Sequence, residues 1–249
     1  METLAGKAII VTGGSRGIGR AIAESCALNG AIVGVNYLHS ELAAHELRER
    51  FPDNIELLRF DVGDYETAKR ALLGFIKRHH KLDALVNNAG ISRPHLILSQ
   101  RNLSRATEEF RVNTLGTMGC TQIALPSMVK NKYGIIINMS SCSVKQPVPG
   151  QASYAASKAA VEAFTRAVAV EYASRGVRCI CLRLGPVETD MLREAVGEIG
   201  MTTTMPQHTL LKRLSSPSEV ADIVRALIVG PYALATGSTL DFTSGYSLG

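Results

Sequence analysis

The sequence contains no tryptophan, and aromatic residues make up only 5% of its 249 residues. Aliphatic and small residues must therefore build the core, and 22 glycines suit helices that pack closely against a sheet. No run of 18 consecutive apolar residues occurs, which argues against a transmembrane helix. The first residues lead directly into an apolar segment, so we expect no signal or transit peptide.

Cysteine is also scarce: the chain has five, with no CxxC pair and no zinc-ligand spacing. We therefore expect no metal and a reducing compartment, which is the cytoplasm, or the mitochondrial matrix if a presequence precedes this chain. The formal net charge is +5, but no dense block of Lys and Arg occurs and no aromatic residues alternate with basic ones. This pattern argues against a nucleic-acid partner, and the lack of apolar runs argues against a membrane partner.

A composition of 46% hydrophobic and 20% charged residues is typical of a globular protein. Short apolar runs rich in β-branched residues alternate with helical stretches, and such runs are usually buried on both faces of a parallel sheet. We predict one domain over residues 1–249, with an α/β, Rossmann-like, doubly wound parallel sheet of seven strands and helices on both faces. The predicted strands span 7–12, 31–36, 55–60, 82–87, 134–139, 177–183 and 239–243. The predicted helices span 19–29, 40–50 after a Ser40 cap, 64–79 after an Asp64 cap, 104–129, 152–174 and a stretch beginning at Pro217.

A glycine-rich segment, TGGSRGIG at 12–19, joins the first strand to the first helix. In a dinucleotide-binding turn of this kind, Gly13 permits the tight turn, Gly17 lets the backbone approach a pyrophosphate, and Gly19 permits close packing of helix on strand. The free N–H groups of the helix then face the phosphates. Arg20 and Ala21 follow where a P-loop needs Lys and Ser or Thr, which argues against ATP hydrolysis.

The end of the second strand indicates which dinucleotide is bound. NAD-binding turns place Asp or Glu there for the ribose 2′-hydroxyl, and residues 36–40 (NYLHS) contain no acid. A 2′-phosphate would meet no repulsion, and Arg16 is available to pair with it. We therefore predict NADPH/NADP+ as the cofactor.

Tyr154 and Lys158 are four residues apart in a predicted helix, so their side chains lie on one face. A neighbouring ammonium favours the tyrosinate and would lower the pKa of Tyr154 from its usual value near 10. Tyr154 could then act as a general acid toward a carbonyl oxygen. Taken alone the spacing is a weak signal, because most such pairs lie on protein surfaces.

Several motifs together resemble the short-chain dehydrogenase/reductase family over essentially the whole length: TGGSRGIG, Asp61-Val62, NNAG at 87–90 and YAASK at 154–158, in the family's order and spacing. The resemblance implies that Ser141 polarises the substrate carbonyl, that Tyr154 donates the proton, and that Asn113 holds a water in the proton relay. It also implies that Lys158 binds the nicotinamide ribose. The cofactor-binding set that it implies is Gly13, Ser15, Arg16, Gly17, Ile18, Gly19, Tyr37, His39, Asp61, Val62, Asn87, Ala89, Gly90, Tyr154, Lys158, Gly185, Val187 and Thr189.

Within that family the chain is most similar to 3-oxoacyl-[acyl-carrier-protein] reductases, in NAGISR at 88–93 and in LKR at 211–213 with SPSEVA at 216–221. This similarity implies reduction of 3-oxoacyl-ACP or -CoA thioesters to 3-hydroxyacyl thioesters, and a homotetramer. It also implies docking of an acidic acyl carrier protein at Lys132 and Arg175, although these could be ordinary solvated charges. The chain departs from the pattern at Leu184, where the family usually has Pro, and at 243–246 (TSGY), where it usually has Asp/Asn-Gly-Gly.

Residues 191–212 are expected to form a substrate lid, whose methionines would suit a pliable apolar pocket. His95 could contact the substrate from a nearby loop.

Two other functions stay open at this point. One is a broad carbonyl or quinone reductase, or an alcohol dehydrogenase; the other is a non-catalytic scaffold that senses NADP(H).

Overall fold

A seven-stranded parallel sheet forms the centre of the structure, a computed structural model that describes residues 3–99, 102–230 and 232–246. The strand order is β3-β2-β1-β4-β5-β6-β7, and each neighbouring pair is parallel. Every predicted strand is present, so the predicted doubly wound sheet is confirmed. The strands are β1 (Ala8–Val11), β2 (Ile32–Tyr37), β3 (Ile55–Arg59), β4 (Ala84–Asn87), β5 (Gly134–Ser141), β6 (Val177–Leu184) and β7 (Thr239–Phe242).

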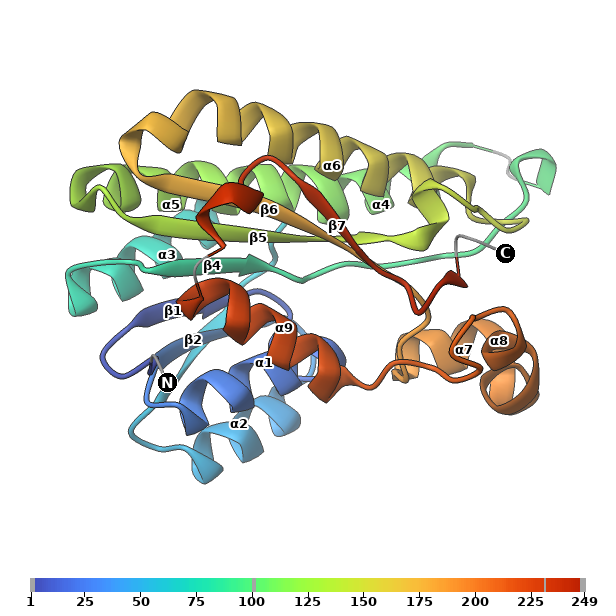
Figure 1. Cartoon of the computed structure of the whole chain (residues 1–249), viewed down its shortest axis with the longest axis horizontal. Helices are drawn as coiled ribbons and strands as arrows, with labels where there is room; N and C mark the ends of the chain where they lie inside the picture. Colours follow the sequence, from blue (N-terminus) through green and yellow to red (C-terminus); the bar gives the residue numbers. More distant parts are fainter. Residues whose placement is uncertain (1–2, 100–101, 231, 247–249) are drawn as a thin grey trace.

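Helices cover both faces of the sheet (Figure 1). On one face lie α1 (Gly17–Leu28), α2 (Glu41–Arg50) and α9 (Pro217–Val229); on the other lie α3 (Tyr65–His79), α5 (Gly116–Asn131) and α6 (Ala152–Tyr172). Successive strand residues point to opposite faces, so Ile9 packs into the first layer and Ile10 into the second. Burial on both faces explains why these strands are continuously apolar.

The helix predicted over 104–129 contains an irregularity that its sequence does not reveal. It begins as α4 (Ser104–Glu109), passes through a π-helical segment (Phe110–Leu115), and continues as α5. Such π segments insert one residue into a helix and often occur at functional sites; this one contains Asn113. Short 3-10 segments lie at Ile97–Ser99, Cys142–Val144, Ala173–Arg175 and Ala233–Ala235.

Two of the predicted helices begin with a side-chain cap. The Asp64 carboxylate accepts hydrogen bonds from the backbone N–H groups of Glu66 and Thr67, and Ser216 forms a capping box with Glu219 before α9. The prediction that Ser40 caps the second helix is wrong. Its side chain makes no capping bond, because its backbone (φ −85°, ψ 63°) is outside the extended region that an N-cap normally adopts.

The predicted lid lies beside the carboxyl ends of the strands, outside the two helix layers (Figure 1). It contains α7 (Asp190–Ile199), a second π-helical segment (Gly200–Thr204) and α8 (Met205–Gln207). Gly197 interrupts α7 with a positive φ of 68°, a conformation that suits glycine. Within the described ranges, no helix is long and apolar enough to cross a membrane.

Candidate active site

A cavity of about 500 Å³ opens at the carboxyl ends of the strands. Its wall includes the turns after β1, β2, β4, β5 and β6, together with residues of the lid. The strand order reverses between β1 and β4, and ligands of open α/β sheets bind at such a switch point. The topology therefore places this cavity where a dinucleotide would be expected.

Hydrogen bonds hold the two turns at the switch point together. The Thr12 hydroxyl accepts from the backbone N–H groups of Asn88 and Ala89, both at 3.0 Å, and the Asn88 amide donates to the Thr12 carbonyl at 2.9 Å. A Cβ on Gly19 would lie 2.2 Å from the Gly13 carbonyl oxygen. The glycine at position 19 is thus required for the close approach that its motif predicts.

Most of the predicted cofactor residues lie in the wall of this cavity: Gly13, Ser15, Arg16, Gly17, Ile18, Tyr37, His39, Asp61, Val62, Ala89, Gly90, Tyr154, Lys158, Gly185, Val187 and Thr189. Gly19 lies behind the wall, for the packing reason just given. Asn87 does not line the cavity: it is 3% exposed, and its amide donates to Thr121 and Asn138 in the sheet interior. The alternation of strand side chains turns Asn87 inward, and the following Asn88 lines the cavity instead.

The first turn has room and donors for a dinucleotide phosphate. Glycines at 13 and 17 have positive φ angles of 61° and 53°, so their backbone can approach a ligand where a side chain would intrude. Helix α1 has no acidic residue in its first turn and no side-chain cap. Its first backbone N–H groups are therefore available to bind a phosphate in the cavity. Arg16 is exposed, and its side chain makes no hydrogen bond or ion pair with the residues that the structure describes. The residues present therefore fit NADP(H).

Two features of this half of the site were not predicted from the sequence. The Asn36 side chain accepts from the Gly13 N–H at 3.0 Å and donates to the Phe60 carbonyl at 2.8 Å, which ties three strand ends together. Asp61 accepts from Gly63 at 2.8 Å and pairs with Arg111 at 2.9 Å. The acids around Arg111 raise its pKa further above the usual range. A short polar residue within an apolar strand was the only sequence signal for Asn36, and Arg111 gave none.

Ser141, Tyr154 and Lys158 all line this cavity. The Ser141 hydroxyl donates to the Ser143 hydroxyl at 3.1 Å and caps the 3-10 segment by accepting from the Ser143 N–H at 3.2 Å. The Lys158 ammonium is 5% exposed, donates to the Met139 carbonyl at 2.9 Å, and lies 5.9 Å from the centre of the Tyr154 ring. The hydroxyls of Ser141 and Tyr154, with the buried Lys158 ammonium close by, can bind a carbonyl oxygen and supply a proton to it.

The predicted fall in the pKa of Tyr154 is wrong for this structure. Burial raises that pKa to about 12, against the opposing effect of the hydrogen bond with Ser141. Burial also lowers the pKa of Lys158 to about 8. The lysine is held on a backbone carbonyl and not on the phenol, so removal from water has the larger effect on both groups.

Asn113 is fully buried within the π-helical segment. Its amide accepts from the Ile91 N–H at 2.8 Å and donates to the Ile91 carbonyl at 2.9 Å and to Ser157 at 3.0 Å. Both amide hydrogens are thus used, so a water could meet this side chain only at the second lone pair of its oxygen. The side chain fixes the loop after β4 against α6.

His95 does not line the cavity; it is 7% exposed beneath the loop. Its Nδ1 lies 2.5 Å from the Arg93 carbonyl oxygen, and its Nε2 lies 3.4 Å from the Ser153 hydroxyl. Ser153 in turn donates to the buried carboxylate of Glu109 at 2.5 Å, which also accepts from the Arg93 N–H. These hydrogen bonds hold the loop that contains Arg93 and His95 against the start of α6, next to Tyr154.

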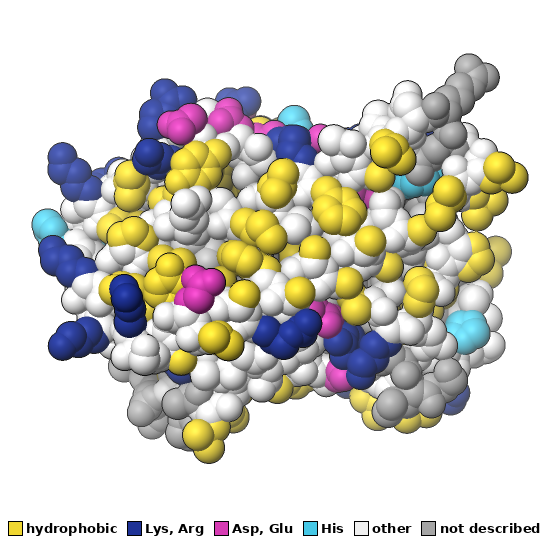
Figure 2. Space-filling view, turned by 90° about the horizontal axis from the view of Figure 1, so that it is seen from above, with side chains coloured by type: hydrophobic (Ala, Val, Ile, Leu, Met, Phe, Trp, Pro, Cys, Tyr) yellow, Lys and Arg dark blue, Asp and Glu magenta, His cyan; other side chains and the backbone are white. Residues whose placement is uncertain are grey.

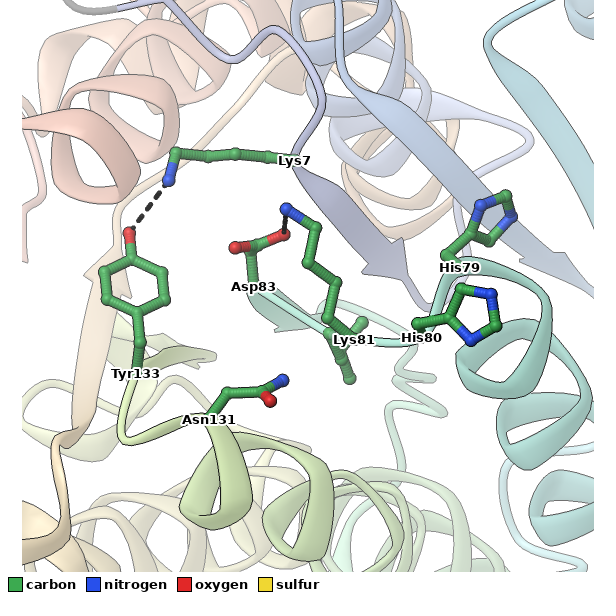
Figure 3. Close-up of a pocket in the computed structure, with 8 residues that line it drawn as sticks. Lys7, His79, His80, Lys81, Asp83, Asn131 and Tyr133 are labelled. Atoms are coloured by element: carbon green, nitrogen blue, oxygen red, sulfur yellow. Dashed lines mark hydrogen bonds and ion pairs between the residues drawn. The ribbon is translucent and has the colours of Figure 1, made fainter.

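A second pocket, of about 420 Å³, lies at the amino ends of β1 and β4, where Lys7 and Asp83 immediately precede these strands; Figure 3 shows the residues that line it. Its cations already have partners: Lys7 donates to the Tyr133 hydroxyl at 3.2 Å, and Lys81 pairs with Asp83 at 3.1 Å. It contains no predicted site residue. Across the described ranges, no group of three or more His, Cys, Asp or Glu side chains could hold a metal ion.

The two proposed docking cations, Lys132 and Arg175, are exposed and lie in adjoining turns. These turns touch, because a Cβ on Gly176 would lie 2.1 Å from the Lys132 carbonyl oxygen. Both precede the amino ends of their strands, whereas Ser141 ends β5. Seven residue steps along β5 span roughly 23 Å, so the docking pair and Ser141 lie at opposite edges of one subunit.

Comparisons with known proteins agree with this geometry. A sequence model described as short chain dehydrogenase matches residues 7–199. The chain is 36% identical to the 3-oxoacyl-[acyl-carrier-protein] reductase FabG of Vibrio cholerae, covering 97% of this chain and 98% of the relative. It is 31% identical to the 7alpha-hydroxysteroid dehydrogenase of Paraclostridium sordellii, covering 100% and 95%. Among solved structures it is similar to a gluconate 5-dehydrogenase from Burkholderia cenocepacia in complex with NADP and tartrate, with a TM-score of 0.92, 28% identity, and coverage of 99% and 97%.

Proposed function

Because the chain belongs to the short-chain dehydrogenase family, we propose that it is an NADPH-dependent carbonyl reductase that acts on 3-oxoacyl thioesters. The observation that supports this most directly is the group of Ser141, Tyr154 and Lys158 at the end of a cavity whose other end has a dinucleotide turn. As a member of this family, it is an oxidoreductase that acts on CH–OH or C=O groups.

NADP(H) is the cofactor. The glycine turn and the first N–H groups of α1 would hold the pyrophosphate, and the free Arg16 would pair with the 2′-phosphate. The neighbouring Tyr37 and His39 line the same end of the cavity. A solved structure of similar fold was determined with NADP.

The protein contributes position, charge and a proton to the reaction. The bound dinucleotide supplies the hydride. Ser141 and Tyr154 would donate hydrogen bonds to the substrate carbonyl oxygen, where negative charge develops during reduction. With a pKa of about 12, Tyr154 is protonated at neutral pH and can act as the acid. The buried ammonium of Lys158 stabilises the tyrosinate left behind and can return a proton to it.

The substrate class is supported by the relatives and by the cavity wall. Relatives that reduce 3-oxoacyl-[acyl-carrier-protein] are 33–36% identical over nearly the full chain. Next to the catalytic group, Val148, Met191 and Met205 line the cavity, and flexible methionines suit an acyl chain. The lid over 191–212, which contributes both methionines, would close on this chain; the positive φ of Gly197 provides a hinge within it.

A carrier-bound substrate sets a geometric condition. A carrier protein held at Lys132 and Arg175 would lie roughly 23 Å from the Ser141 of the same subunit, so we propose that it serves the cavity of another subunit. The charge-reversed Lys132→Glu/Arg175→Glu double variant should then raise KM for a 3-oxoacyl-ACP and leave KM for acetoacetyl-CoA unchanged. If the double variant raised KM equally for both substrates, Lys132 and Arg175 would have no role in docking the carrier protein.

The proposed assembly is a homotetramer in which α5 and α6 form a subunit contact. Figure 2 shows hydrophobic side chains distributed across the face above these helices. Leu115, which ends the π-helical segment before α5, and Val170 of α6 are 59% and 85% exposed, and exposed apolar side chains on these helices support a subunit contact. Light scattering of the purified protein would measure the mass, and a monomer would contradict the assembly.

The deciding experiment is NADPH oxidation at 340 nm with a 3-oxoacyl-ACP, acetoacetyl-CoA and a quinone, with NADH in parallel. We expect the acyl thioesters to give the highest kcat/KM, and Tyr154→Phe to abolish turnover while NADPH still binds. A preference for the quinone or for a secondary alcohol would replace the substrate proposal, since two of the similar proteins are named for alcohol-type substrates. Tight NADPH binding without any turnover would favour a sensing scaffold.

A further inference from the structure

A row of polar side chains crosses the sheet immediately beneath the catalytic group. The strand register places Arg183 of β6 between Ser140 of β5 and Asp241 of β7. Residues paired in this way project to the same face of a sheet, and that face is covered by α6. The next residue of β5 is Ser141. The row therefore lies one residue below the end of the strand that positions the predicted catalytic serine.

Glu162 of α6 closes this row from above. Arg183 donates to both oxygens of the Glu162 carboxylate, at 2.9 and 2.6 Å, and to Asp241 at 2.6 Å. Ser140 donates to Glu162 at 2.6 Å, and Lys145 donates to Asp241 at 2.9 Å. The side chains of Arg183 and Glu162 are only 8% and 7% exposed. We call these five residues the Arg183 network.

The Arg183 network joins the three chain segments that form the reactive end of the cavity. Glu162 lies four residues after Lys158, so it is on the same face of α6 one turn later. Ser140 immediately precedes Ser141, and Arg183 lies two residues before Gly185. Neither Arg183 nor Glu162 lines the cavity, so neither can touch substrate or cofactor.

We propose that Arg183 and Glu162 are positioning residues, whose buried two-point ion pair fixes Ser141 relative to Tyr154 and Lys158. A guanidinium that binds both oxygens of one carboxylate constrains orientation as well as distance. The pair also joins α6 directly to β6, in addition to the hydrogen bonds from Lys158 to Met139 and from Asn138 to Thr165 that join α6 to β5. This inference uses the proposed reductase activity for its kinetic test, but its structural test does not depend on that activity.

A competing explanation is that the pair only stabilises the fold. The two explanations can be separated, because replacing both partners of a buried ion pair by apolar residues often preserves stability, whereas removing one partner leaves an unpaired buried charge. The variants are Glu162→Gln, Arg183→Lys and the double variant Glu162→Met/Arg183→Met. The matched control is Glu56→Met/Arg78→Met, which removes a two-bond ion pair between β3 and α3, together with the contact of His79 to Glu56, away from the cavity.

The readouts are Tm, the Kd for NADPH, and kcat and KM with acetoacetyl-CoA. We expect Glu162→Gln to lower both Tm and kcat, and the double variant to recover Tm while its kcat stays at least tenfold low. The Kd for NADPH should change less than twofold. Arg183→Lys keeps the positive charge but cannot bind both oxygens of the Glu162 carboxylate in the same way, so its kcat should be intermediate. The control double variant should keep the wild-type kcat. A double variant with both Tm and kcat restored would overturn the proposal.

Hydrogen exchange provides the test that needs no substrate. If the wild-type protein does not turn over acetoacetyl-CoA, the proposed function fails, and amide exchange over residues 139–146 still measures how firmly the serine segment is held. We expect faster exchange there in the double variant and in Glu162→Gln, with no change in the control pair. Wild-type exchange in both variants would refute the positioning role. Glu162→Gln changes one atom of the side chain, so it decides the outcome if the double variant does not fold.

Discussion

We predict that Lys158, the proposed catalytic lysine, makes the protein less stable, and the substitution Lys158→Met tests this directly. The side chain is 5% exposed, and it pairs with a backbone carbonyl and not with an acid. Methionine has a similar length and needs no hydration. The variant should lose turnover, because the tyrosinate loses its cation, yet its folded state should gain stability at neutral pH.

The size of the gain can be worked from the pKa of Lys158, which burial lowers from 10.5 to about 8. At about 1.4 kcal/mol per pKa unit, keeping the ammonium in the folded protein at pH 7 costs about 3 kcal/mol. Losing the donor to the Met139 carbonyl offsets about 1–2 kcal/mol of this. The net gain of about 1–2 kcal/mol corresponds to a rise in Tm of about 2–8 °C for a chain of this length.

The pH dependence of this gain provides the control. Below pH 8 the lysine is protonated in both the folded and the unfolded chain, so the full cost is present. Between pH 8 and 10.5 the folded protein releases the proton while the unfolded chain keeps it, so wild-type stability rises with pH. The advantage of Lys158→Met should therefore shrink through that interval and become a disadvantage of about 1–2 kcal/mol above it, where only the lost hydrogen bond to Met139 remains. Lys69→Met, at an exposed position of α3, should stay within about 0.5 kcal/mol of wild type.

The assay is thermal unfolding of both variants and wild type, without cofactor, at pH 7 and at intervals up to pH 10.5. A lower Tm for Lys158→Met at pH 7 would show that the buried ammonium stabilises the fold. A gain of equal size at pH 7 and pH 10.5 would show that methionine packs better for reasons unrelated to charge. Either result would refute the argument from burial.

Three further predictions concern the same site. Reductive kcat/KM, measured from pH 6 to 10, should fall as pH rises through about 8, where the Lys158 ammonium loses its proton; a flat profile across pH 8 would contradict this. Arg16→Ala should weaken NADPH binding about 10–100-fold, since a charge-assisted hydrogen bond contributes about 1.5–3 kcal/mol, and should spare NADH; equal weakening in titrations with both would exclude contact with the 2′-phosphate. Gly19→Ala would place a Cβ 2.2 Å from a backbone oxygen of the same turn and should abolish NADPH binding in a fluorescence titration. Gly74→Ala on α3 would bring its Cβ into ordinary contact, at 3.5 Å, with the end of the Arg78 side chain; it should bind normally and gain up to about 1 kcal/mol in stability.

The sheet and the dinucleotide turn could be predicted because their determinants are local. A strand buried on both faces must be continuously apolar, and a turn that approaches a phosphate needs glycine at fixed positions such as Gly13 and Gly17. The pairing of Tyr154 with Lys158 on one helix face follows from helix geometry in the same way. Each of these features can be recognised within fewer than ten residues of sequence.

The features that could not be predicted depend on residues far apart in the chain. The π-helical segment around Asn113 is held by bonds to Ile91 and Ser157, which nothing near position 113 reveals. Glu109 and Glu162 look like solvated charges on helix faces, yet both are buried. Their donors come from other elements and meet them only in the folded chain.

The pKa of Tyr154 could not be predicted for a related reason. Helix spacing indicates which side chains are neighbours, but not how far each is removed from water. The Lys158 ammonium lies 5.9 Å from the centre of the Tyr154 ring, and burial of the phenol nonetheless raises its pKa. Asn87 illustrates the same limit: the motif identifies the correct turn, and only the strand alternation decides which of its two asparagines faces the ligand.

The reversal of strand order between β1 and β4 also has a consequence for how the chain acquires its stability. The central strand β1 cannot complete its pairing until β4 has been synthesised, and such long-range parallel contacts form slowly. The cofactor cavity spans the same reversal, so it exists only when both halves of the sheet are joined. A ligand that binds only the finished fold stabilises it by mass action. The cellular concentration of NADPH should therefore influence how much newly made chain persists in the folded state.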